Sequence, residues 1–310
     1  NMVENMSMQI GNIYPPAQWF TNAVAKPDFL SLLLFAGVSV TVFFVMVVIV
    51  SHYFTGICNA LRARESGKRA DISKLKENSV IRALYQKEWK RFLASGVYVS
   101  NAAIGDILVI VLAVALCIVG VEKAESIMQL PGLVTRLYPY ALCFMMAIMP
   151  TTSCAISMEG QQWWLTRSLP VRTGDIVNSK ILVNLTLAFP CYVIAEIFSC
   201  MAIKTNLAGY LILIFVPLVY MIFVSVTGLT MNLLFPVFDW ENEAKAVKQS
   251  GATMLAMLVN VVCLIVPFIL AFVVNQESQI LVSAIFMIIW LVIAGVLYQF
   301  NIRTDLRKIG

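Results

Sequence analysis

Two carboxylates lie inside long apolar stretches of this chain, where ionisable side chains are costly and often functional. Asp106 stands near the beginning of one stretch and Glu196 near the far end of another. Asp106 is expected in the first two turns of its helix, where the helix dipole and interfacial water are a sufficient explanation. Glu196 could line a path through the membrane, or form a structural hydrogen bond with a Ser or Thr of a neighbouring helix. Both residues are candidate intramembrane polar sites.

The chain carries none of the short motifs that mark common enzymes or nucleotide-binding proteins. A phosphate-binding loop requires Gly-x-x-x-x-Gly-Lys-Ser/Thr, but Gly67-Lys68 is followed by Arg69. His-Glu-x-x-His and Gly-x-Ser-x-Gly are absent, and His52 is the single histidine. The seven cysteines have no ligand spacing with a matching histidine, so they are expected to be packing residues and no metal site is expected. The sequence predicts neither an enzyme activity nor a cofactor on this chain.

A charged segment with two tryptophans separates two almost uncharged stretches. Residues 157–180 read SMEGQQWWLTRSLPVRTGDIVNSK, and Glu159–Ser168 is expected to form about two to three turns of helix. Glu159 in the first turn and Arg167 in the last turn complement the helix dipole. Pro170 prevents the helix from continuing. The segment is therefore expected to be a short cytoplasmic helix between two spans.

Trp163 and Trp164 project about 100° apart from such a helix, so they are expected to have different environments. One can bury at the membrane surface while the other enters a groove of a partner protein, where Trp is a typical anchor. The alternative is that both tryptophans belong to the aromatic belt at the inner membrane surface.

The elements that must position these residues are membrane-spanning helices. The 310 residues are 60% hydrophobic and 13% charged, whereas soluble domains are about 45–50% apolar and about 25% charged. The excess lies in runs of about 20 residues or more without strand-like alternation, which predicts an all-α, polytopic membrane bundle. Seven spans are expected: Leu30–Tyr53, Asn101–Gly120, Leu137–Met158, Ile181–Ile203, Tyr210–Phe235, Gly251–Val274 and Ile280–Phe300.

Lysine and arginine are distributed unequally between the two sets of connections. Of the 22 Lys and Arg residues, 18 lie in one set and 4 in the other. The rich set is 54–100, 159–180, 236–250 and 301–310, and the poor set is 1–29, 121–136, 204–209 and 275–279. Because cytoplasmic loops carry the excess of positive charge, the N-terminus is expected outside and the C-terminus in the cytoplasm. The expected location is a cell membrane, of the bacterial inner-membrane kind.

The expected organisation follows from these spans. It comprises an outer segment 1–29, a first span 30–53, a cytoplasmic linker with an interfacial helix 54–100, a six-span unit 101–300 and a cytoplasmic tail 301–310. The chain begins Asn1-Met2 without a cationic, apolar targeting segment. We therefore expect either an upstream segment that was removed or a longer chain whose earlier spans set the orientation.

The second part of the linker predicts a cationic amphipathic helix over Ile81–Leu93. One stripe is apolar, with Ile81, Leu84, Tyr85, Trp89, Phe92 and Leu93 at spacings of three and four, and the other face holds Arg82, Lys87, Lys90 and Arg91. Such a helix before a span is expected in the inner membrane interface, with its basic side toward anionic headgroups. The alternative is a solvated helix.

The order of these elements resembles the type-2 ABC exporter permeases. Lys87-Glu88-Trp89-Lys90-Arg91, followed by Asn101 and Gly105 at the opening of a span, is similar to the connecting helix of that family. The opening Ser157, Glu159 and Gly160, together with Leu169-Pro170 and Lys180, resembles the loop that forms the family's coupling helix. The stretch FPVFDWENEAKAVKQ from Phe235 resembles an inner loop of large bacterial permeases. The resemblance covers roughly residues 80–300.

This resemblance implies a permease subunit that moves substrate with energy from a separate ATPase. The implied coupling residues are Glu159, Gly160, Trp163, Trp164, Arg167, Leu169 and Pro170. The implied partners are a P-loop ATPase, which binds ATP and Mg²⁺, membrane lipid, and either a missing N-terminal half or a second permease chain. No nucleic acid is implied. The six-span unit with one preceding span fits the second half of a permease built from two tandem units.

Three other classes of membrane protein are alternatives to this interpretation. A secondary transporter that works without an ATPase needs coupling-ion ligands at mid-membrane, for which Glu196 is the candidate. A heptahelical receptor matches the number of spans, but the largest inner loop precedes the second span and no acidic-Arg pair closes the third. A membrane-embedded enzyme lacks catalytic groups. The secondary transporter is therefore the main alternative.

Overall fold

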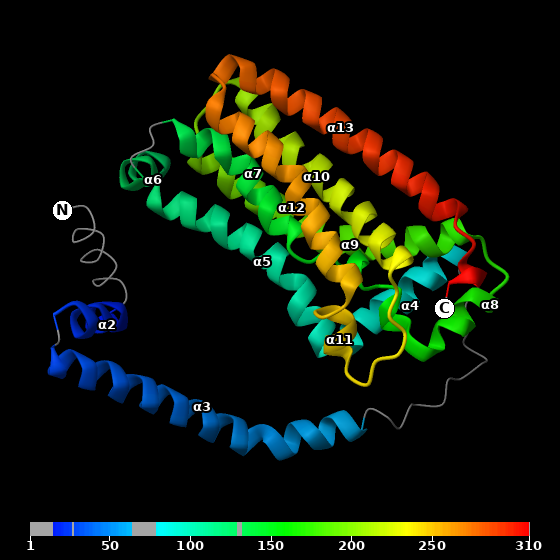
Figure 1. The fold of residues 1–310 in the computed structure, drawn as a ribbon, viewed down its shortest axis with the longest axis horizontal. Coiled ribbons are helices and arrows are strands. Elements are labelled where there is room, and N and C mark those ends of the chain that lie inside the picture. Colours follow the sequence, from blue (N-terminus) through cyan, green and yellow to red (C-terminus); the bar gives the residue numbers. More distant parts are fainter. Residues whose placement is uncertain (1–14, 27, 64–78, 129–131, 310) are drawn as a thin grey trace. The chain divides into compact units, whose positions relative to one another are not determined.

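The computed structural model describes residues 15–26, 28–63, 79–128 and 132–309, and the regular elements in these residues are all helices (Figure 1). Seven segments of the described residues are long and apolar enough to cross a membrane, which confirms the predicted all-α class and number of spans. Most of the expected outer segment and the first part of the linker lie outside the described residues. The chain divides into two compact units, Asn1–Lys76 and Glu77–Gly310, and each is described by itself.

The first unit contains helix α2, Pro15–Ala25, and helix α3, Phe29–Ala63. Proline suits the beginning of α2 because the first N–H groups of a helix have no partner within it. Asp28 precedes α3 and accepts hydrogen bonds from Leu30 N at 3.1 Å and Ser31 Oγ at 2.6 Å. Almost all described side chains of α3 are exposed within this unit, as expected for a helix in contact with lipid.

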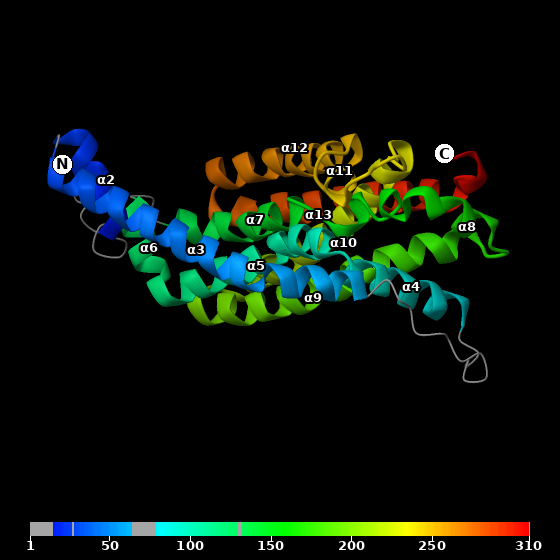
Figure 2. The same cartoon turned by 90° about the horizontal axis from the view of Figure 1, so that it is seen from below.

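The second unit is a bundle in which α10 packs against α7, α9, α12 and α13, while α5 packs against α9. Its helices are α4 (Val80–Ala94), α5 (Gly96–Val119), α6 (Val121–Met128), α7 (Leu133–Ala147), α8 (Trp163–Ser168), α9 (Thr173–Ala202), α10 (Leu207–Leu234), α11 (Glu243–Val247), α12 (Gly251–Val273) and α13 (Gln276–Arg303). Helix α6 lies at one end of this bundle, and α4 and α8 lie at the opposite end (Figures 1 and 2). We call these the α6 end and the α8 end.

Small residues allow the helices to approach closely at two crossings. A Cβ atom added to Gly228 of α10 would lie 2.5 Å from Thr152 Oγ1. A Cβ atom added to Gly105 of α5 would lie 2.6 Å from the carbonyl oxygen of Met145 in α7. A larger side chain at Gly105 would push α5 away from α7, and one at Gly228 would push α10 away from the segment around Thr152.

The third span, expected over Leu137–Met158, is interrupted. Helix α7 ends at Ala147, and two short 3₁₀ turns, Thr151–Ser153 and Ser157–Gln162, follow Pro150. Proline ends the helix because it lacks an N–H group and its ring clashes with the preceding turn. Irregular backbone at membrane depth is tolerated where protein covers it, and residues 150–160 are all buried.

Two asparagines of neighbouring helices replace the hydrogen bonds that the interrupted span loses. Asn184 Oδ1 of α9 accepts a hydrogen bond from Thr151 N at 2.7 Å. Asn232 Oδ1 of α10 accepts hydrogen bonds from Ile156 N at 2.7 Å and Ser157 N at 3.1 Å. Because a buried N–H group without a partner is costly, these contacts hold the segment that leads into α8 in one position.

Candidate functional site

Five charged side chains meet at the α8 end, and we call them the charge cluster: Lys87, Glu88 and Arg91 of α4, Glu159 of the second 3₁₀ turn, and Lys180 of α9. Glu159 Oε1 lies 2.7 Å from Lys180 Nζ and 3.4 Å from Arg91 Nη1, and its Oε2 lies 3.2 Å from Lys87 Nζ. Glu88 pairs with Arg91 at 3.1 Å and with Lys180 at 3.0 Å. Each carboxylate therefore bridges α4 and α9.

The centre of the charge cluster is closed to solvent. The side chains of Glu159 and Lys180 are 0% and 1% exposed. Two further groups complete their hydrogen bonding: Lys180 Nζ donates to the carbonyl of Ala155 at 3.0 Å, and Thr166 Oγ1 of α8 donates to Glu159 Oε2. Removing one partner of such a buried pair leaves an uncompensated charge and typically costs about 3–5 kcal/mol. The charge cluster therefore fixes the mutual positions of α4, α8 and α9.

The two α4 cations at its rim respond differently to burial. Desolvation lowers the pKa of Lys87, although the carboxylate of Glu159 opposes this change. Burial alone would also lower the pKa of Arg91, but the carboxylates of Glu88 and Glu159 outweigh it and raise the pKa above its ordinary value. Arg91 therefore stays charged, so its ion pairs persist over a wide pH range.

The position of Lys87 and Arg91 corrects the expectation that they face lipid headgroups. Both side chains lie toward Glu159, because α9 and the 3₁₀ turn cover this side of α4 and buried carboxylates attract cations. Lys90 remains exposed. The predicted apolar stripe is covered only in its middle: Leu84 and Phe92 are buried and Trp89 is half-buried, whereas Ile81 and Leu93 are exposed.

Helix α8 begins four residues later than the helix expected from Glu159. Residues 157–162 form the 3₁₀ turn, in which Gly160 has φ +53° and ψ −139°. This conformation favours glycine, and a Cβ atom at Gly160 would lie 3.0 Å from Trp240 Cζ2. Glu159 consequently faces the charge cluster and does not complement the dipole of a helix, whereas Arg167 does lie in the last turn of α8.

The two adjacent tryptophans have different environments. Trp163 is 3% exposed, stacks on Phe238 with ring centroids 5.8 Å apart, and donates from its indole nitrogen to the carbonyl of Ile309 at 2.9 Å. Trp163 is thus buried within the chain itself. Trp164 is 60% exposed, and Leu165 and Leu169 beside it are 50% and 37% exposed. We call these three exposed side chains the apolar knob.

The 236–250 connection and the last described residues also contact this region. Trp240 Nε1 donates to the carbonyl of Ser157 at 2.7 Å, and Ser95 Oγ at the beginning of α5 donates to Glu243 of α11. Arg167 Nη1 of α8 donates to the carbonyl of Ile309 at 3.3 Å. Segments far apart in the sequence therefore meet around α8.

The central role of Lys180 was not predicted from the sequence. Lys180 was noted only as one residue of the motif that resembles the permease family, yet it contacts both carboxylates of the charge cluster. Thr166, Asn184 and Asn232 were not singled out. A signal was available for one of them, because Asn184 follows Lys180 by four residues and so lies on the same face of α9.

The two intramembrane carboxylates lie in different surroundings. Because α5 begins at Gly96, Asp106 is in the third turn of its helix and not in the first two. Asp106 lines a small cavity of about 10 Å³ with Pro150 and Asn184, roughly the space of one water molecule. Glu196 is 7% exposed, and neither carboxylate oxygen has a hydrogen-bond partner among the described residues. The alternative of a structural hydrogen bond to Ser or Thr is therefore wrong for this structure.

The seven spans and the helical bundle define a multi-pass membrane protein. A family model described as a membrane protein of 12 TMs matches residues 1–299, so the chain belongs to this family of membrane proteins. No curated protein matches the chain, and no solved structure matches it.

Proposed function

We propose that this chain is a permease subunit of an ATP-driven exporter, similar to the type-2 ABC permeases, and that the α8 end couples a separate ATPase to the spans. The charge cluster is the observation that carries this proposal. Ion pairs buried between α4, the 3₁₀ turn and α9 make the region around α8 stiff. A displacement of α8 is then transmitted to α4 and α9. A flexible loop in the same place would absorb the displacement and transmit nothing.

The apolar knob is the proposed contact with the ATPase. Trp164 is a large apolar side chain that projects from a connection rich in Lys and Arg, and that enrichment supports a cytoplasmic location. Exposed tryptophans of this kind are frequent anchors of protein interfaces. In this proposal the ATPase binds ATP and Mg²⁺, and the present chain contributes the membrane path and its lipid contacts.

The number of spans supports an arrangement in tandem units. The family description names 12 transmembrane segments, and the described residues of this chain hold seven candidate spans. We assign α5, α7, α9, α10, α12 and α13 to one six-span unit and α3 to the end of a preceding unit. Two such units, in one chain or in two permease chains, would give the 12 segments of the family.

Trp164→Ala is the sharpest test of this proposal, because it removes the anchor without touching the buried core. The variant should fold as the unchanged protein does and bind a P-loop ATPase that co-purifies with the unchanged protein at least ~30-fold more weakly, as expected when ~2 kcal/mol of interface energy is lost. Leu207→Ala is the matched control, since Leu207 is 78% exposed at the α6 end. Affinity for the purified ATPase is measured in detergent. Unchanged affinity of the Trp164→Ala variant would contradict the coupling role.

A secondary transporter without an ATPase remains the alternative function, and the unpaired carboxyl of Glu196 favours it. The two functions differ in their energy source. ATP-dependent transport out of sealed vesicles that contain ATP and the ATPase supports the exporter. Transport that persists without ATP, driven by an ion gradient, supports the secondary transporter.

A further inference from the structure

Glu196 has no part in the proposed coupling, and a buried carboxyl group without a hydrogen-bond partner is unusual inside a bundle of apolar helices. The side chain lies in α9, is 7% exposed, and both carboxylate oxygens are buried without a hydrogen-bond partner among the described residues. An ionised carboxylate in such surroundings is very costly, and the group becomes neutral by taking up a proton. The carboxyl group of Glu196 is therefore expected to hold a proton in this position.

The groups around Glu196 do not compensate a negative charge. The titratable side chains close enough to interact electrostatically with Glu196 include Tyr138 and Cys143 of α7 and Tyr192 and Cys200 of α9. None of these is a cation. The tyrosine hydroxyls are engaged elsewhere, since Tyr138 shares a 2.7 Å hydrogen bond with Ser199 Oγ and Tyr192 donates to the carbonyl of Ile214 at 2.8 Å.

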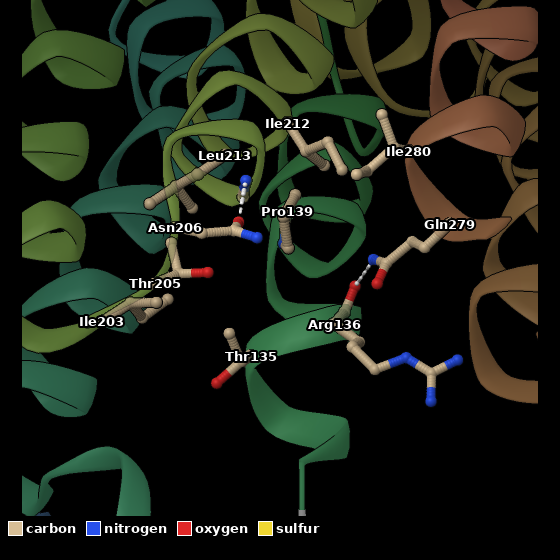
Figure 3. A pocket seen from close by; sticks show the side chains of 11 residues that line it. Thr135, Arg136, Pro139, Ile203, Thr205, Asn206, Ile212, Leu213, Gln279 and Ile280 are labelled. Carbon is tan, nitrogen blue, oxygen red and sulfur yellow. Dashed lines mark hydrogen bonds between the residues drawn. The ribbon is translucent and has the colours of Figure 1, made fainter. Parts of the chain in front are cut away.

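A pocket of about 250 Å³ opens at the α6 end, between the beginnings of α7, α10 and α13 (Figure 3). Five polar side chains line it, one of them a cation: Thr135, Arg136, Thr205, Asn206 and Gln279. Gln279 Nε2 donates to the carbonyl of Arg136 at 2.8 Å, and Asn206 Oδ1 accepts from Gly209 N at 2.8 Å (Figure 3). These groups suit water, so the pocket provides a polar vestibule at this end of the bundle.

The pocket and Glu196 adjoin one seam, where α7 meets α9 and α10. Tyr138 of α7 shares a hydrogen bond with Ser199 of α9, and Tyr192 of α9 donates to the carbonyl of Ile214 in α10. Ile203, directly after α9, and Leu213 of α10 line the pocket and belong to the same buried apolar cluster as Tyr138, Tyr192 and Ala195. This cluster therefore joins the pocket wall to the residues around Glu196.

We propose that Glu196 is a proton-binding site that is reached from the pocket at the α6 end. The carboxyl group is neutral in the conformation described here. When α7 and α9 separate, its O–H bond breaks and the proton passes to water in the pocket, leaving the carboxylate hydrated. Helices α7 and α9 directly precede and follow the segment with α8, so a displacement of α8 changes the same seam. The site does not depend on whether an ATPase drives the protein.

Infrared spectroscopy of the purified protein tests this proposal without any transport assay or ATPase. At neutral pH the unchanged protein should show a carbonyl band of a protonated carboxylic acid. Glu196→Gln should remove this band, whereas Glu122→Gln should keep it, because Glu122 is exposed on α6. A band of equal intensity in the Glu196→Gln variant would show that another group carries the proton and would overturn the proposal.

A second measurement covers the case in which Glu196→Gln fails to fold. Labelling all glutamates of the unchanged protein with ¹³C shifts the band of a protonated glutamate and leaves that of a protonated aspartate such as Asp106 in place. A shifted band supports the proposal, and an unshifted or absent band contradicts it. Loss of ATPase binding in other variants would leave both measurements unaffected, so the two proposals fail independently.

Discussion

At the scale of single residues, Lys180 is central to the packing of α4, α8 and α9 at the α8 end. Its ammonium group lies 2.7 Å from Glu159 and 3.0 Å from Glu88, with 1% of the side chain exposed. Two buried carboxylates therefore rely on one lysine that comes from a different part of the chain. Arg91 also contacts both carboxylates, but its side chain is more exposed.

Replacing Lys180 by methionine should destabilise the protein by about 3–5 kcal/mol, because the two buried carboxylates lose the ammonium group that contacts both of them. Lys90→Met is the matched control, since Lys90 is exposed on α4, and it should change stability by less than about 0.5 kcal/mol. Denaturant unfolding in detergent measures both. Adding Glu159→Gln to Lys180→Met should recover part of the loss. Equal stability of the two single variants would contradict the structural importance of the charge cluster.

At the scale of elements, the short segment between α7 and α8 is held by side chains of other helices. Asn184 and Asn232 pair with its backbone, and Trp240 packs on Gly160. Its path depends on a glycine conformation that other residues adopt only with strain. The orientation of α8, and hence of the apolar knob, therefore depends on Gly160.

Gly160→Ala should lower stability by about 1–3 kcal/mol, because alanine is strained at φ +53° and its methyl group would meet Trp240. Gly174→Ala tests the specificity of this effect. Gly174 lies in the first turn of α9, where a Cβ atom would make an ordinary contact of 3.9 Å with Ile302, so that variant should be neutral or slightly more stable. Thermal unfolding of both variants distinguishes the two cases. A Gly160→Ala variant as stable as Gly174→Ala would refute the constraint.

At the scale of the whole molecule, the distribution of positive charge assigns a side of the membrane to each end of the second unit. The connections at the α8 end carry most of the lysines and arginines, and α6 at the other end lies in a poor connection. Because cytoplasmic connections carry the excess of positive charge, we expect the α8 end in the cytoplasm and the pocket at the α6 end outside. Coupling to an ATPase requires this orientation.

Cysteine labelling in intact cells tests the orientation directly. With native cysteines replaced, Lys123→Cys on α6 should react with a membrane-impermeant thiol reagent, because this exposed position faces the medium. Lys245→Cys on α11 is equally exposed and should react only after the membrane is opened. The reverse pattern would place α8 outside the cell, and no cytoplasmic ATPase could then reach the apolar knob.

The amino-acid sequence was sufficient to predict the number of spans and the all-helical class, and it also predicts the side of the membrane on which each loop lies. These properties depend on composition summed over stretches of about 20 residues, and such sums are local. A helix before the second span was also visible from its periodicity, and α4 exposes Lys90 and buries Leu84 and Phe92 as that pattern predicts, whereas Lys87 and Arg91 pair with Glu159.

The ion pairs between charged residues and the point where the third span is interrupted depend on the three-dimensional packing. Lys87 and Glu159 are 72 positions apart, and the sequence pattern placed Lys87 toward lipid because its partner carries no periodic signal. The backbone path beyond Pro150 depends on Asn184 and Asn232 from helices later in the chain. The physical reason is that a buried ion pair or a replaced backbone hydrogen bond depends on which helix faces meet, and that choice belongs to the packing of the bundle and not to any one stretch of sequence.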